Sequence, residues 1–303
     1  MISTKYKALL LYIRALRVKN KLDVSTKDFE AVIERLKARN NNLVSNEVKE
    51  NLSDEIIIVE GKKVYIFNPK NDAKGAIVYL HGGGFIMTAT KMDFNWCRVL
   101  ADNSNSKVYM PIYPLIPDFT LEDMVLFIDA VYKNSLKDWQ SEEIKMLGFS
   151  AGASLILSYM AYLFSNNMKD IVPKKIFLSS PIAEIPVSEE TFTKLLDNDK
   201  LDPLFSASAF KKLENYLIRD ESYAYLGQIE KVDMKGLCPL YVTYGEKEVM
   251  KGFSYILERL AKRDGISLEL KIGKGMIHCW QCFLMVKEGR DGQRELIEKI
   301  NEI

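Results

Sequence analysis

The sequence predicts an α/β fold with a mostly parallel central sheet, helices on both faces of the sheet and a helical cap. Apolar strand-like runs alternate with helical segments from Ala76 onward, which is the pattern of a parallel sheet. Ser150 stands between two glycines where one strand passes into one helix. The alternation breaks over residues 181–235, a stretch long enough to form a lid or cap.

Two helices are expected before the first strand. Residues 5–19 place Tyr6, Leu10 and Ile13 at helical spacing, which predicts an amphipathic helix. A second helix is expected from Ser25 or Thr26 as N-cap to about Arg39, where the asparagine run 40–42 ends it.

The rest of the chain alternates between strands and helices on either side of the break. The expected strands are 56–59, 64–67, 76–80, 107–112, 143–148, 175–179, 240–244 and 267–271. The expected helices are 91–102, 121–136, 151–166, 189–196, 207–218 and 249–263, followed by C-terminal helices.

Composition indicates an ordinary globular protein. Of its 303 residues, 48% are hydrophobic and 27% charged, and the net charge of +1 shows no nucleic-acid-binding footprint. Four irregularly placed cysteines do not suggest a disulfide scaffold, and no run is long and apolar enough to span a bilayer. We therefore expect a cytoplasmic protein; a homodimer is compatible with the sequence.

The first helix is basic, with Lys5, Lys7, Arg14 and Arg17 among its charged residues. Such a helix could lie on an anionic membrane. More often such a helix covers apolar surface of its own protein, and this is the interpretation we favour.

Gly148, Ser150 and Gly152 form a Gly-x-Ser-x-Gly pentapeptide. The turn is too tight for side chains at the two glycines, so it forces the serine into a strained conformation and raises its hydroxyl above the sheet edge. The helix that follows points free N–H groups at the same place.

A serine hydroxyl needs a base, usually a histidine that a carboxylate orients. Only His81 and His278 are present. Enzymes with the nucleophile on a strand–turn–helix bend carry serine, acid and histidine in that chain order, which selects His278. By position, both Glu246 and Glu248 qualify as the acid, because both follow the strand at 240–244.

A glycine loop, His81-Gly82-Gly83-Gly84, follows the strand at 76–80. Its flexible backbone can turn N–H groups of Gly82 and Gly83 toward one point, where, with that of Ala151, they would meet a developing oxyanion. A phosphate loop would need a Gly-Lys-Ser/Thr ending. Cys279 and Cys282 form a Cys-x-x-Cys pair that we interpret as helix-packing thiols, because zinc would need further ligands. We expect neither a metal nor a cofactor.

Together, these motifs resemble the hormone-sensitive-lipase-like group of α/β-hydrolases, over about residues 76–278. The stretches that carry the resemblance are His81 to Phe85, Tyr113 to Pro117, Gly148 to Gly152, Ser180-Pro181, Gly245 to Glu248, and His278. The resemblance implies an α/β-hydrolase fold and the hydrolysis of short- to medium-chain acyl esters.

The resemblance also implies roles and boundaries. The family's acid follows the strand-end glycine after two residues, which favours Glu248 over Glu246. His81 and Gly84 would support the glycine loop. Residues 1–45 and 182–235 would form the cap, and residues 46–181 and 236–303 the catalytic domain.

The sequence therefore predicts a serine carboxylesterase acting on a small-molecule ester through Ser150, Glu248 and His278, by way of an acyl-enzyme intermediate. The alternatives are an amidase or peptidase on the same fold, or a ligand-binding relative that has lost turnover.

Overall fold

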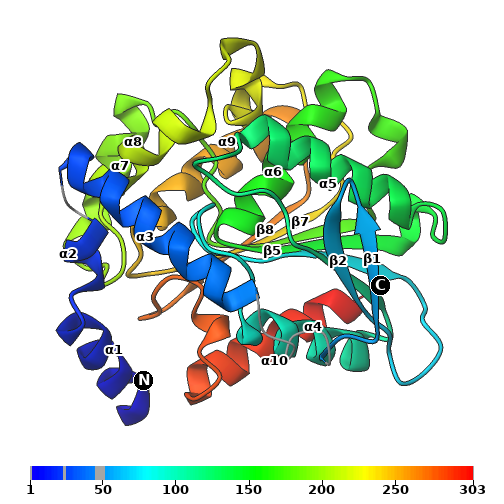
Figure 1. Cartoon of the computed structure of the whole chain (residues 1–303), viewed down its shortest axis with the longest axis horizontal. Helices are drawn as coiled ribbons and strands as arrows, with labels where there is room; N and C mark the ends of the chain where they lie inside the picture. Colours follow the sequence, from blue (N-terminus) through cyan, green and yellow to red (C-terminus); the bar gives the residue numbers. More distant parts are fainter. Residues whose placement is uncertain (1, 23–24, 45–51, 303) are drawn as a thin grey trace.

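An eight-stranded sheet forms the centre of the protein, whose computed structural model describes residues 2–22, 25–44 and 52–302 (Figure 1). The strand order is β1-β2-β4-β3-β5-β6-β7-β8. β1 and β2 pair antiparallel, as do β2 and β4, and the pairs from β4 to β8 are parallel. The strands are β1 Glu55–Val59, β2 Lys62–Phe67, β3 Ala76–Leu80, β4 Lys107–Pro111, β5 Ile144–Phe149, β6 Lys175–Ser179, β7 Leu240–Gly245 and β8 Leu268–Gly273.

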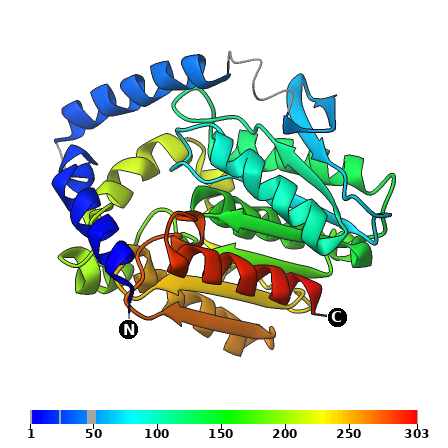
Figure 2. The same ribbon diagram turned by 90° about the horizontal axis from the view of Figure 1, so that it is seen from below.

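Helices cover both faces of this sheet, as the sequence predicted (Figures 1 and 2). On one face α4 (Lys91–Ser104) and α10 (Lys287–Asn301) enclose an aromatic-rich core around Trp96. On the other face α5 (Leu121–Ser135), α6 (Ala151–Ser165) and α9 (Ser254–Asp264) enclose the larger core. Nearly every side chain of α6 is buried, which explains its apolar sequence all round. The predicted mostly parallel α/β fold is confirmed.

The remaining helices pack over loops that follow the carboxyl ends of the strands. They are α1 (Thr4–Ala15), α2 (Val18–Leu22), α3 (Thr26–Val44), α7 (Glu189–Asp199) and α8 (Ala207–Leu217). Phe29 of α3 and Phe210 of α8 belong to the same apolar core. Lys19 of α2 pairs with Asp199 at the end of α7 at 2.9 Å, so the N-terminal helices and the inserted segment contact each other.

Most predicted elements agree with the structure to within a few residues, but three helix boundaries were wrong. The first helix ends at Ala15, because Arg17 has a left-handed φ of 49°. The second helix runs through the asparagine run to Val44. The helix predicted at 249–263 begins with a 3-10 segment, Val249–Phe253, and becomes α-helical only from Ser254.

Candidate active site

Ser150 lies on a sharp turn between β5 and α6. Its φ of 53° and ψ of −121° are strained for a residue with a side chain. A Cβ on Gly152 would lie 2.1 Å from the carbonyl oxygen of Leu80, and one on Gly148 would lie 2.5 Å from the amide nitrogen of Ala153. The turn therefore requires both glycines, as expected from the pentapeptide.

His278 follows β8 and donates from Nδ1 to Oε2 of Glu248 at 2.6 Å. The other carboxylate oxygen, Oε1, accepts from the N–H of Gly245 at 2.5 Å and from the hydroxyl of Ser180 at 2.8 Å. Glu248 is fully buried, so these three hydrogen bonds compensate its desolvation. The bond to Glu248 leaves Nε2 as the basic nitrogen of neutral His278.

Glu246, the other acid that the sequence left open, points elsewhere. Its Oε2 accepts from the N–H of Gly275 at 2.7 Å. This contact stabilises the loop before His278 without reaching the imidazole. Of the two glutamates, only Glu248 has a hydrogen bond to His278 among the described residues.

The segments that carry Ser150 and His278 meet at the carboxyl end of β6. The N–H of Ser150 donates to the carbonyl of Ser179 at 2.8 Å, and the sulfur of Cys279 lies 3.6 Å from the same oxygen. Within the described residues, the Ser150 hydroxyl makes no hydrogen bond to His278; Nε2 has the sulfur of Cys279 at 3.5 Å instead. Catalytic hydrogen bonds are often loose until substrate binds, so the arrangement suits a serine–imidazole pair that closes on the substrate.

The electrostatic surroundings of His278 favour its protonated form. Burial lowers the pKa of the imidazole, but Cys279 and Glu248 beside it outweigh burial and raise this pKa well above the usual value. The ring of Phe205 packs edge-on against the imidazole, with the ring centroids 4.9 Å apart. Glu248 and Phe205 therefore hold the imidazole from two sides.

The glycine loop approaches Ser150 closely. A Cβ on Gly82 would lie 3.4 Å from that of Ser150, and Gly83 has a φ of 125° that disfavours any side chain. No described residue accepts a hydrogen bond from the N–H of Gly82 or Gly83. Ala151 is the first residue of α6, where backbone N–H groups have no intrahelical acceptor. These amides can therefore receive a negatively charged oxygen.

His81 is buried and contacts the glycine loop. Its Nδ1 donates to the carbonyl of Gly82 at 2.7 Å, and its ring stacks on Tyr113 with centroids 4.2 Å apart. The Tyr113 hydroxyl donates to the His81 carbonyl at 2.6 Å. Gly84, with a φ of 63°, continues the turn. This arrangement can hold the loop in shape.

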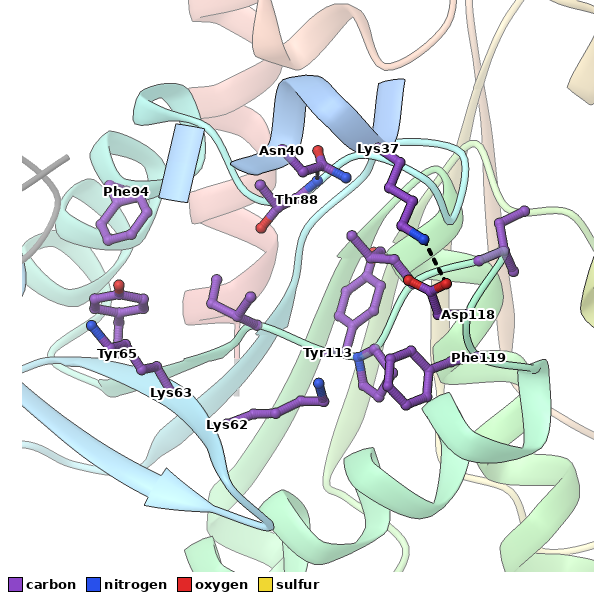
Figure 3. Close-up of a pocket in the computed structure, with 14 residues that line it drawn as sticks. Lys37, Asn40, Lys62, Lys63, Tyr65, Thr88, Phe94, Tyr113, Asp118 and Phe119 are labelled. Carbon is purple, nitrogen blue, oxygen red and sulfur yellow. Dashed lines mark hydrogen bonds and ion pairs between the residues drawn. The ribbon is translucent and has the colours of Figure 1, made fainter. Parts of the chain in front are cut away.

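Tyr113 also lines a cavity of about 360 Å³ between α3, β2 and the segment after β4. Figure 3 shows the residues around it. Lys37 pairs with Asp118 at 2.6 Å on its wall, and the Lys62 ammonium lies 4.7 Å above the Phe119 ring. Ser150, Glu248 and His278 do not line the cavity. Tyr113 therefore links the cavity to the glycine loop. The lining residues are Lys37, Asn40, Lys62, Lys63, Tyr65, Thr88, Phe94, Ile112, Tyr113, Pro114, Leu115, Ile116, Asp118 and Phe119.

The inserted segment supplies contacts that the sequence analysis did not identify. Buried Asp202 accepts from the N–H of Val249 at 2.8 Å, and Asn198 donates to the carbonyl of Glu248 at 3.0 Å. These polar residues lie in a stretch with no motif, so no local pattern indicated their role. Cys279 lies in the buried cluster that also holds Leu296 and Ile300 of α10, and Cys282 packs against this cluster, so the interpretation of the pair as helix-packing thiols is confirmed. The sequence did not indicate the second contact of Cys279, which has a left-handed φ of 46° before the 3-10 turn Trp280–Cys282 and places its sulfur beside His278.

Known proteins that resemble this chain include esterases and lipases. An esterase of Acinetobacter venetianus is 25% identical over 210 residues, covering 68% of each chain. A triacylglycerol lipase of Mycobacterium tuberculosis is 24% identical over 228 residues, 73% of this chain and 45% of the lipase. The crystal structure of an esterase from the bacterial hormone-sensitive lipase family shares the fold, with a TM-score of 0.77 and 20% identity over 99% of this chain and 98% of that one. The family model for the alpha/beta hydrolase fold matches residues 77–282, and the chain therefore belongs to the α/β-hydrolase family.

Proposed function

We propose that this chain is a serine carboxylesterase in which Ser150 is the nucleophile, His278 the base and Glu248 the acid that orients it. The observation that carries the proposal is the 2.6 Å hydrogen bond between Glu248 and His278, in a chain whose Ser150 lies on a strained strand–helix turn. The related esterase and lipase support the same reaction class.

The proposed reaction follows from these positions. As the Ser150 oxygen attacks the ester carbonyl, Nε2 of His278 takes its proton, and Glu248 stabilises the resulting imidazolium. The former carbonyl oxygen becomes negative and accepts hydrogen bonds from the amides of Gly82, Gly83 and Ala151. One such donor is worth about 10²- to 10³-fold in rate in a well-studied protease. His278 then protonates the leaving alcohol, and water releases the acid from Ser150.

The substrate class that we propose is an ester with a short or medium acyl chain. We propose that residues 1–45 and 182–235 act as the cap over the site, since Phe205 contacts His278 and Asn198 contacts the Glu248 loop. A series of 4-nitrophenyl esters of increasing acyl length tests the size of the acyl site. We expect kcat/KM to be highest at short or medium chains; a rate that keeps rising into long chains would contradict this.

The test of the reaction is a Ser150→Ala variant. We expect it to lose hydrolysis of 4-nitrophenyl acetate and labelling by a fluorophosphonate probe, with an unchanged melting temperature. Ser158→Ala is the matched control, because Ser158 is a buried serine further along α6, and it should keep both activities. Turnover that persists in Ser150→Ala would refute the proposal. A faster rate on a matched anilide than on the ester would favour an amidase.

A further inference from the structure

Helix α1 has two apolar faces, and only one of them is covered. Tyr6, Leu10 and Ile13 are buried and pack in a cluster with Ile277 and Trp280. This face of the helix therefore covers apolar surface of its own protein, as expected from the sequence. Leu11 and Tyr12, in contrast, are 66% and 62% exposed. Because Ala8, Leu11, Tyr12 and Ala15 follow helical i, i+3, i+4 and i+7 spacing, these exposed residues form one stripe on the outer side.

Basic side chains surround this outer stripe. Lys5, Lys7, Arg14 and Arg17 are all exposed, and none of them forms an ion pair with another described residue. Residues 1–22 contain six basic and no acidic residues, whereas the rest of the chain has 36 basic and 41 acidic residues. The positive charge of this protein is therefore concentrated on one peripheral segment.

Both overall views place α1 at the outer edge of the molecule, beside the N-terminus (Figures 1 and 2). Lys7 and Arg14 are seven residues apart and so lie along one border of the stripe. Long basic side chains can extend past an apolar stripe to reach anionic groups beside it. This combination of an apolar stripe, a basic border and peripheral placement is the chemistry of a helix that lies in a membrane interface.

We propose that the outer face of α1, formed by Ala8, Leu11, Tyr12 and Ala15 with Lys7 and Arg14 at its border, seats this protein on an anionic phospholipid surface. A second copy of the chain fits the face less well, because a two-fold contact would bring the basic residues of two α1 helices together. No helix in the described part of the chain is long and apolar enough to cross a bilayer. In the proposed contact α1 lies on the membrane surface.

The same helix is bound to the loop that carries His278. The N–H of Ile277 donates to the Tyr6 hydroxyl at 2.9 Å, and the Ser3 hydroxyl donates to Glu288 at 2.9 Å. Because α1 would lie between them, docking would hold the His278 loop one helix diameter, ~10 Å, from the lipid surface. If the proposed esterase function holds, this placement favours esters presented by membranes; the docking itself does not depend on hydrolysis.

Co-sedimentation of the full chain with vesicles tests the proposal. We expect binding to phosphatidylcholine vesicles that contain phosphatidylserine, little binding to pure phosphatidylcholine, and loss of binding at high salt. Lys7→Gln/Arg14→Gln should bind about 30-fold more weakly, from about 1 kcal/mol for each basic residue near an anionic surface. Leu11→Ser/Tyr12→Ser should also weaken binding.

Matched controls lie on other surfaces. Lys231→Gln/Lys262→Gln removes two exposed lysines from elsewhere, and Ile58→Ser removes a residue that is 63% exposed on β1. Both control variants should bind vesicles like the wild type. Ser150→Ala should also bind like the wild type, because docking does not depend on hydrolysis, and all variants should stay folded. Failure of the wild type to bind anionic vesicles, or unchanged binding by Lys7→Gln/Arg14→Gln, would overturn the proposal. A dimer in light scattering that Leu11→Ser/Tyr12→Ser disrupts would assign the face to a second copy and also overturn it.

Discussion

The sulfur of Cys279 lies 3.5 Å from Nε2 of His278, the ring nitrogen that would take the proton of Ser150. Cys279 is buried and is held there by its backbone, because its N–H donates to the Ser180 hydroxyl at 3.3 Å. Ser180 in turn donates to Glu248, so one hydroxyl positions both neighbours of the imidazole. The thiol is therefore part of the surroundings that set the basicity of His278.

The first prediction concerns the pH dependence of hydrolysis. In the proposed mechanism the neutral imidazole is the base, so kcat/KM should rise with pH as His278 loses its proton. Because Cys279 and Glu248 raise the pKa of His278 despite its burial, the wild-type midpoint should lie above the usual 6.5. Cys279→Ala removes one of the two raising contacts and should move the midpoint to lower pH.

Cys282→Ala is the matched control for this measurement, because Cys282 lies three residues further along and has no hydrogen bond to the imidazole among the described residues. Alanine keeps the Cβ at position 279, so the substitution does not relieve the strain of the left-handed backbone there. The same midpoint in the wild type and in Cys279→Ala would show that the thiol does not affect the imidazole.

The second prediction separates the two glutamates. Glu248→Gln removes the carboxylate that would orient His278 and stabilise its cation, and we expect kcat to fall about 10⁴-fold, as for the equivalent change in a well-studied protease. Glu246→Gln keeps an oxygen that can accept from Gly275, so its kcat should change little. Steady-state kinetics on 4-nitrophenyl acetate measures both. Equal losses in the two variants would argue against the assignment of Glu248.

The third prediction concerns Ser180, whose hydroxyl bonds to the buried carboxylate of Glu248. Ser180→Ala should lower the free energy of unfolding by about 2 kcal/mol, the usual value for a hydrogen bond to a charged group. It should also lower kcat, because Glu248 loses one of its anchors. Urea denaturation and kinetics measure the two effects.

Ser179→Ala provides the comparison for Ser180→Ala. Ser179 is buried one residue earlier and donates to the uncharged amide oxygen of Gln281 at 3.1 Å. We expect it to cost about 1 kcal/mol of stability and to leave kcat unchanged. If Ser180→Ala also lost stability without losing kcat, the hydroxyl would serve the fold and not the base.

Local sequence was enough to predict features that steric limits enforce. A Cβ on Gly152 would lie 2.1 Å from the Leu80 carbonyl oxygen. The glycine spacing around Ser150 therefore reflects a steric constraint of this kind of turn, which the sequence alone can reveal. Most strands could be predicted because they contain a short apolar run, as in β3 with its sequence AIVYL, whereas β8 alternates apolar and charged residues in LELKIG. The sheet order and the antiparallel pairing of β1 with β2 depend on contacts distant in sequence.

Tertiary contacts explain what local patterns did not predict. The asparagine run was expected to end the second helix, since asparagine competes for backbone hydrogen bonds. Asn40 instead uses both ends of its amide on another segment: it donates to the Ile86 carbonyl at 2.5 Å and accepts from the Thr88 N–H at 3.0 Å. No property of residues 25–44 alone indicates that these partners exist.

The last prediction follows from this contact. Asn40 ties α3 to the segment directly after the glycine loop, where Ile86 and Met87 already bond to the Gly83 carbonyl. Asn40→Ala removes both hydrogen bonds, so we expect a loss of about 1–2 kcal/mol in the free energy of unfolding. It should also lower kcat, because a small displacement of the proposed oxyanion donors can cost up to about 10²-fold in rate.

Asn40→Asp separates the two contacts, because a carboxylate can accept from Thr88 but cannot donate to Ile86. If the Ile86 contact positions the loop, Asn40→Asp should lose as much kcat as Asn40→Ala. Asn103→Ala, which removes only a hydrogen bond within α4 at an exposed position, should leave kcat unchanged. A lower melting temperature with normal kcat in both Asn40 variants would mean that α3 stabilises the fold without holding the glycine loop. Because Gly82 and Gly83 lie only a few residues before Ile86, we expect the two effects to be coupled.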